Sequence, residues 1–246
     1  MAVTAAGSRR ASLHPGRCLA LAVGFLVLFA LARAFGLLGP PVVSASILTL
    51  GMVLIAWRSG ATVDDLGLRR DRVRAGLLYG FGAFAVVLLV LVLVAAIPAT
   101  RGFLQDTRAE IDGGQLAYEV GVTIVLLTAV PEELAFRGVV LGSARSLWGS
   151  RYAVLVSSGL FGLWHIEPTV KTMSGNSAVG GASSSTGGQV LLVLGAVAVT
   201  FVAGLLFCWL RLRSRSLMAP FIAHVATNGL ALVVAWVLLH QSLLAK

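Results

Sequence analysis

The sequence is short of charged residues. Only 12% of its 246 residues are charged and 58% are hydrophobic, which gives a mean hydropathy of +0.93. A soluble globular chain is roughly one-quarter charged. The shortage therefore excludes an ordinary water-soluble domain and predicts that most of the surface faces hydrocarbon. We expect a single all-α membrane domain.

Cysteines and acidic residues are also few. The two cysteines, Cys18 and Cys208, lie in apolar segments without metal-type spacing, which excludes a disulfide framework or a zinc knuckle. Ten acidic residues stand against 19 basic ones, for a net charge of +9. The basic residues form short clusters between apolar runs, not one amphipathic face. They therefore predict membrane topology and no nucleic-acid partner.

Apolar runs long enough to cross a bilayer recur along the chain. They predict a polytopic transmembrane helix bundle of about seven spans, at 18–38, 42–57, 75–98, 117–141, 152–166, 189–210 and 217–240. We expect four regions: an N-terminal tail at 1–16, about three N-terminal spans at 17–100, a catalytic core at 117–240 and, within it, a flexible Gly/Ser-rich loop at 169–188. No internal repeat is visible, so an inverted-repeat transporter gains no support.

The basic clusters fall on alternate sides of the predicted spans. One side collects Arg9, Arg10, Arg17, Arg58, Arg69, Arg70, Arg72, Arg74, Arg145, Arg151, Arg211, Arg213 and Arg215, and the other only Arg101, Arg108, Lys171 and Lys246. Cytoplasmic loops carry the excess of arginine and lysine. The pattern predicts a cytoplasmic N-terminus and an external C-terminus in the cytoplasmic membrane of a bacterium.

Two adjacent carboxylates, Glu132 and Glu133, interrupt the apolar run at 117–141. An ionised side chain at mid-bilayer costs at least ~2.5 kcal/mol, so such a pair indicates function. Arg137 follows Glu133 by four residues, which places the two on one helix face for an ion pair. Glu132 points about 100° away and is left free for chemistry. Pro131, just before the pair, is expected to open the helix locally.

Two histidines and an asparagine also lie in apolar runs: His165, His224 and Asn228. Counted from the nearest arginine on the basic side, Glu132, His165 and Asn228 are each 13 or 14 residues along their helices. At 1.5 Å per residue this is roughly 20 Å, and His224 lies one turn nearer the basic side. We expect these polar groups to meet at one depth.

The ordered set Glu132-Glu133-x-x-x-Arg137, Phe161-x-x-x-His165 and His224-x-x-x-Asn228 resembles the CPBP family of intramembrane proteases. This family includes the CAAX prenyl proteases and bacteriocin-processing, lysostaphin-resistance-protein-A-like proteins. The resemblance covers roughly residues 117–240. It implies hydrolysis of a peptide bond in a membrane-associated or lipid-tailed peptide.

The site implied by the resemblance comprises Glu132, Glu133, Arg137, His165, His224 and Asn228. Glu132 is expected to activate water with help from His165, and His224 with Asn228 to stabilise the oxyanion. A zinc enzyme with Glu132, His165 and His224 as ligands is the rival chemistry, although no H-E-x-x-H is present. We favour no metal cofactor. A proton-coupled transporter and a non-catalytic immunity or scaffold protein remain alternative functions, and the partners expected are membrane lipids and the peptide substrate.

Overall fold

The computed structural model describes residues 14–104, 106–172 and 184–244, and these fold into helices without any strand. The expected all-α bundle is therefore confirmed for this part of the chain. Most of the predicted tail at 1–16 and the middle of the predicted loop at 169–188 lie outside the described residues. Helix α7 (Ile166–Thr172) covers the start of that predicted loop, and α9 (Thr186–Ser214) begins before its end.

Five helices are long and apolar enough to cross a membrane, counted over the described ranges. They are α1 (Pro15–Ala34), α2 (Pro41–Arg58), Arg70–Ala96, which contains α3 (Val73–Ala96), α9 (Thr186–Ser214), and Met218–Gln241, which combines α10 (Met218–Val225), η7 (Ala226–Leu230) and most of α11 (Ala231–Leu244). Each corresponds to a predicted apolar run. The chain thus forms a polytopic helical bundle.

The other two predicted runs are helical but interrupted. The chain passes through α4 (Gly113–Tyr118), η4 (Glu119–Ala129), α5 (Val130–Glu133), η5 (Leu134–Val140) and α6 (Leu141–Trp164). Helix α6 is kinked at Gly149, whose φ of 76° lies outside the helical range. Neither run is among the five long apolar helices, so the count of about seven spans stays a prediction.

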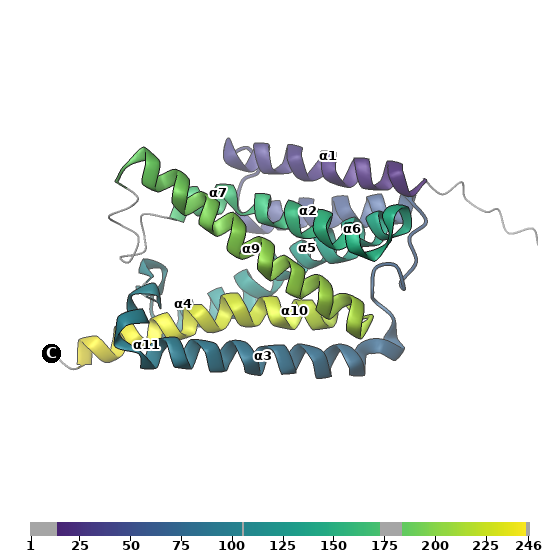
Figure 1. Ribbon diagram of the computed structural model, residues 1–246. Helices are drawn as coiled ribbons and strands as arrows, with labels where there is room; N and C mark the ends of the chain where they lie inside the picture. The colour runs from purple at the N-terminus through teal and green to yellow at the C-terminus, as the bar shows by residue number, and fades with distance from the viewer. Residues whose placement is uncertain (1–13, 105, 173–183, 245–246) are drawn as a thin grey trace, which may run out of the picture.

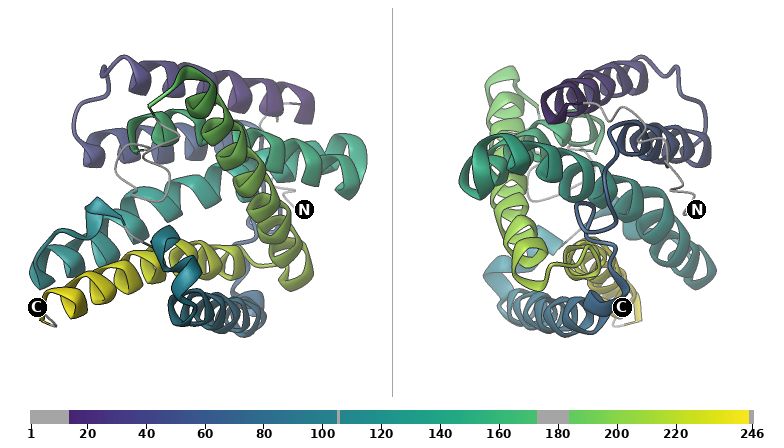
Figure 2. Two further views of the ribbon diagram at one scale, coloured as in Figure 1. Left: turned by 60° about the vertical axis from the view of Figure 1, so that its left-hand side comes forward. Right: turned by 90° about the vertical axis from the view of Figure 1, so that its right-hand side faces the viewer.

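Successive helices run in alternating directions between two ends of the molecule (Figure 1). The start of α1, the end of α2, the start of α3 and the end of α9 share the right-hand end in that view. Both views of Figure 2 place α1 and α2 on the opposite side of the molecule from α3. Helix α9 crosses between these sides and packs on α6, while α10 packs on α3. The basic clusters near these helix ends therefore gather at one end.

The buried core surrounds α5 and η5. Phe136, Arg137 and Val140 are fully buried there, and Phe161 of α6 packs against them from the next helix. A buried arginine among aromatic rings is unusual for a core and requires compensation. The two glutamates lie in the same buried segment.

Candidate active site

The helix that carries Glu132 and Glu133 is widened on both sides of the pair. Segments η4 and η5 are π-helical, and the four α-helical residues between them include Pro131. Proline has no N–H and its ring crowds the carbonyl one turn earlier. The Val130 N–H accordingly donates to the carbonyl of Val125, five residues back. Such π-helical turns frequently mark functional sites, and the expected local opening of the helix is present.

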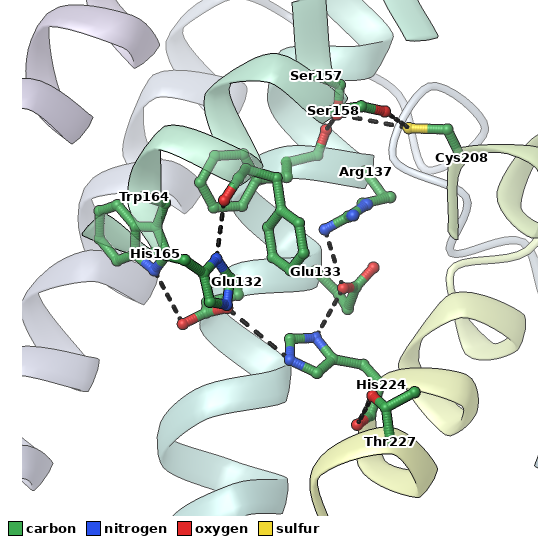
Figure 3. A network of polar contacts seen from close by, with 12 residues as sticks. Glu132, Glu133, Arg137, Ser157, Ser158, Trp164, His165, Cys208, His224 and Thr227 are labelled. Carbon is green, nitrogen blue, oxygen red and sulfur yellow. Dashed lines mark hydrogen bonds and ion pairs between the residues drawn. The ribbon is translucent and has the colours of Figure 1, made fainter. Parts of the chain in front are cut away.

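Glu133 forms a chain of contacts with Arg137 and His224. Its Oε1 accepts from Arg137 NH1 at 3.1 Å and from His224 Nδ1 at 2.8 Å. All three side chains are nearly inaccessible to solvent. The expected Glu133–Arg137 ion pair is thus confirmed, while the bond from His224 in α10 was not anticipated. This bond links the segment that carries Glu133 to α10 and holds the His224 imidazole in position (Figure 3).

Arg137 lies among aromatic rings. Its guanidinium carbon is 4.0 Å from the ring centroid of Phe161 and 5.0 Å from that of Phe207 in α9. Nε and NH2 of Arg137 have no hydrogen-bond partner in the described part of the chain. The negative ring faces attract this cation and lower the cost of burying it. The rings and Glu133 together hold Arg137 in one position.

Glu132 points away from this ion pair. Its Oε1 accepts from Trp164 Nε1 at 2.9 Å. Its Oε2 is buried and has no hydrogen bond to any described residue, and His224 Nε2 lies 3.9 Å away. A buried carboxylate oxygen without a donor is costly and calls for an explanation. Oε2 of Glu132 therefore faces the His224 imidazole across a distance longer than a hydrogen bond.

His165 approaches Glu132 from α6 (Figure 3). Its Nδ1 lies 2.8 Å from the Phe161 carbonyl oxygen, and its ring packs on the Phe161 ring at 4.6 Å. A carbonyl only accepts, so Nδ1 carries a proton and Nε2 of a neutral ring is left as an acceptor. The Phe161 ring also contacts His224, at 5.8 Å. The Phe161 ring thus packs against both imidazoles.

Asn228 does not join the other five residues. Its side chain is exposed and makes no hydrogen bond within the described ranges. The neighbouring residue, Thr227, bonds instead to the His224 carbonyl at 2.9 Å. Asn228 lies within the π-helical segment η7, which begins two residues after His224, and the expectation that the two act together stays a prediction. A wider turn changes the angle between residues four apart.

The rival zinc chemistry would use Glu132, His165 and His224 as ligands. No three His, Cys, Asp or Glu side chains among the described residues are placed to hold an ion together. A catalytic zinc needs three protein ligands, and Glu132, His165 and His224 do not offer that arrangement. One glutamate and two histidines are nevertheless a donor type that catalytic zinc sites use, so zinc hydrolysis stays the rival of the metal-free reaction.

Three aromatic residues near the site had no role predicted from the sequence: Trp164, Phe161 and Phe207. Trp164 had a usable signal, because a tryptophan beside His165 in an apolar run needs a partner for its N–H. Its ring also stacks on Phe29 of α1 at 5.7 Å and lies under Arg33. Phe207 carried no signal, since nothing in the sequence relates it to Arg137.

Comparison with known families gives one match. Residues 114–230 match the model of the Rce1-like family, the type II CAAX prenyl endopeptidases. No curated protein and no solved structure matches. The match confirms the family resemblance of the motifs and contains all six predicted site residues. It supports a CAAX-type intramembrane endopeptidase in general, within a multi-pass integral membrane protein.

Proposed function

With the match of residues 114–230 to the type II CAAX prenyl endopeptidases as the premise, we propose that this protein is a glutamate-dependent intramembrane endopeptidase. It hydrolyses a peptide bond in a membrane-associated or lipid-tailed peptide. The observation that carries the proposal is the buried Oε2 of Glu132, which has no hydrogen bond to a described residue and faces His224 Nε2 at 3.9 Å. General bases act on water from such positions.

In the proposed reaction Glu132 takes one proton from a water molecule as the water oxygen attacks the carbonyl carbon of the substrate. His165 Nε2 accepts a hydrogen bond from the same water and orients it. The carbonyl π electrons move to its oxygen, which becomes the oxyanion of a tetrahedral intermediate. When the C–N bond breaks, Glu132 returns the proton to the amine nitrogen. Trp164 holds Oε1 of the carboxylate, which leaves Oε2 for both transfers.

His224 is proposed as an oxyanion donor. Its Nδ1–H donates to Glu133, so a proton on Nε2 gives an imidazolium between two carboxylates. With Arg137, the buried set of two anions and two cations is then neutral, which limits its burial cost. Asn228 is exposed in η7, four residues after His224, and is proposed as a second donor to the oxyanion once the substrate is bound. Removing one such donor typically slows turnover by ~10²-fold.

An apolar groove beside the site suits a hydrocarbon chain. It has a volume of about 550 Å³ and lies between α3 and α9, with Tyr79, Val86 and Leu206 on its walls. Phe207 and Thr227 also line it, and Phe207 stacks on His224 at 5.4 Å. An apolar tail in this groove would bring an attached peptide to the catalytic residues. This favours a lipid-tailed substrate over an unmodified soluble peptide.

The test uses purified protein in liposomes with three labelled peptides: one lipid-tailed, one membrane-spanning and one without an anchor. Glu132→Gln is expected to reduce cleavage of an anchored peptide by ~10²-fold or more, because a general base contributes at least this much. Glu110→Gln removes an exposed carboxylate and is the matched control. It should cleave like the unmodified protein.

Membrane insertion and thermal unfolding of both variants show whether each is folded. Equal cleavage by Glu132→Gln and Glu110→Gln would exclude Glu132 as the base. No cleavage by the unmodified protein, together with full biological function of Glu132→Gln in cells, would favour the immunity or scaffold alternative. Cleavage that disappears with a chelator and returns with zinc would overturn the metal-free reaction.

A further inference from the structure

The loop between α2 and α3 is fastened to α9 by a buried arginine. NH2 of Arg211 donates to the backbone carbonyls of Asp64 and Asp65 at 3.1 and 2.9 Å. Its guanidinium lies against Gly67, where a Cβ would come within 2.3 Å of Arg211 Nε. The side chain of Arg211 is only 3% exposed. Its charge is thus held in a fixed place by neutral groups, without a carboxylate bound to it.

A polar pocket of about 360 Å³ opens beside Arg211. Two further arginines share it, Arg145 of α6 and Arg215 at the end of α9. The rest of its lining is Asp64, Asp65, Ser150 and Leu212. Three arginines, one from α6 and two from the end of α9, therefore line one pocket.

The two aspartates of the pocket are engaged within their own loop. Asp65 Oδ2 accepts from the Thr62 N–H and hydroxyl at 2.8 and 2.7 Å. Asp64 Oδ1 lies 3.8 Å from Arg69 NH1. Neither carboxylate makes an ion pair with a pocket arginine in the described part of the chain. The arginines are consequently left without a bound anion.

The pocket arginines have unused donors. Arg145 and Arg215 make no side-chain hydrogen bond or ion pair to any described residue, and Arg211 Nε is buried without a partner. Arg215 also has a φ of 54°, the only positive value outside glycine in the described ranges. Arg215 is the C-cap of α9, a position where this left-handed conformation commonly ends a helix. The buried Nε of Arg211 therefore calls for a partner, and an anionic ligand shared with the exposed Arg145 and Arg215 would supply it.

We propose that this pocket binds a phosphate group. Guanidinium groups hold phosphate oxygens through paired hydrogen bonds, and the Ser150 hydroxyl supplies one more donor. The pocket lies at the end of the bundle where α2 ends and α3 begins, close to the basic clusters. An anionic lipid headgroup at the membrane surface is the source that this position favours. Inorganic phosphate has the same chemistry and is separated from the lipid in the test.

The test is native mass spectrometry of the purified full chain in detergent micelles with phosphatidylglycerol. Phosphatidylcholine is measured in parallel, and inorganic phosphate is added as a competitor. We expect phosphatidylglycerol to remain bound, and the double variant Arg145→Gln/Arg215→Gln to bind it at least about tenfold more weakly, because each lost charged hydrogen bond is worth that factor or more. Both positions are exposed, so the fold is expected to persist.

The matched control is Arg74→Gln/Arg213→Gln. Both arginines are exposed and neither lines the pocket, and the net charge falls equally. Equal losses of phosphatidylglycerol binding in the two double variants would show that only net charge matters and would overturn the site. Unchanged binding in Arg145→Gln/Arg215→Gln would also overturn it. Displacement by millimolar inorganic phosphate, with no preference between the lipids, would keep the site and identify free phosphate as its ligand. Peptide cleavage is not part of this readout.

Discussion

At the level of single residues, aromatic neighbours hold the polar groups of the candidate site: Trp164 donates to Glu132, and the Phe161 ring packs against both His165 and His224. Glu132, Glu133, Arg137, His165 and His224 stand out because charge and imidazole are rare in apolar runs. Phe161 enters only as part of the motif that contains His165, and Trp164 is marked only by an N–H that needs a partner in an apolar run. Which of two adjacent glutamates pairs with Arg137 followed from helix spacing. That His224 binds Glu133 depends on the packing of α10 and could not follow from spacing.

Trp164 is expected to position Glu132 for catalysis. Trp164→Phe removes the N–H that donates to Oε1 at 2.9 Å and keeps an aromatic ring against Phe29. Loss of a hydrogen bond to a charged group costs about 1.5–3 kcal/mol. We expect kcat to fall at least about tenfold with KM nearly unchanged, because substrate binding does not involve this bond. Steady-state cleavage of a lipid-tailed peptide measures both constants.

Trp148→Phe is the control for this change, because Trp148 is half exposed and lies outside the site. It should leave kcat and KM as they are. A Trp164→Phe variant with unchanged kcat would show that the Trp164 bond does not position the carboxylate. A parallel rise in KM would indicate instead that the variant disturbs the substrate groove.

At the level of helices, hydrophobic length predicted where helices lie but not how they are wound. The run at 117–141 is helical as expected, yet its π-helical parts on either side of Pro131 were visible only as a proline in an apolar segment. Segment η7, which contains Asn228, has no proline, so its wider turn had no signal in the sequence. Local widening depends on contacts with neighbouring helices, which the sequence does not specify residue by residue.

Gly67 is expected to matter for the connection between α2 and α3. It has a φ of +73°, and a Cβ there would be 2.3 Å from Arg211 Nε. Its carbonyl also accepts from the Leu217 N–H at 2.8 Å. Gly67→Ala therefore strains the backbone, at about 1–2 kcal/mol, and displaces the buried guanidinium as well. We expect a clear drop in the thermal unfolding midpoint in detergent.

Gly36→Ala separates these two effects. Gly36 has a similar φ of +70°, but a Cβ there would meet nothing within 4 Å. Its midpoint should fall by the backbone cost alone, and so less than that of Gly67→Ala. Equal falls would mean that Arg211 moves aside without cost and that its fastening of the loop adds no stability.

At the level of the whole molecule, the arginine pattern predicted which segments share an end of the bundle. The alternating helix directions place the ends of α2 and α9 and the start of α3 together, in agreement with the clusters assigned to one side (Figure 1). Which side faces the cytoplasm follows only from the positive-inside rule and stays a prediction. The fold itself does not reveal the orientation, because apolar helix surfaces are compatible with either direction across the membrane.

Cysteine labelling in intact cells tests this direction. Cys18 and Cys208 are buried, so the unmodified protein should react little with a membrane-impermeant maleimide. Ser146→Cys adds an exposed thiol at the basic end, and Thr107→Cys adds one beyond the far end of α3. We expect Thr107→Cys to be labelled in intact cells and Ser146→Cys only after the membrane is permeabilised, since the positive-inside rule predicts that the arginine-rich end faces the cytoplasm. The opposite pattern would reverse the predicted orientation and would place the phosphate pocket at the outer surface, where the argument for an anionic cytoplasmic lipid no longer applies.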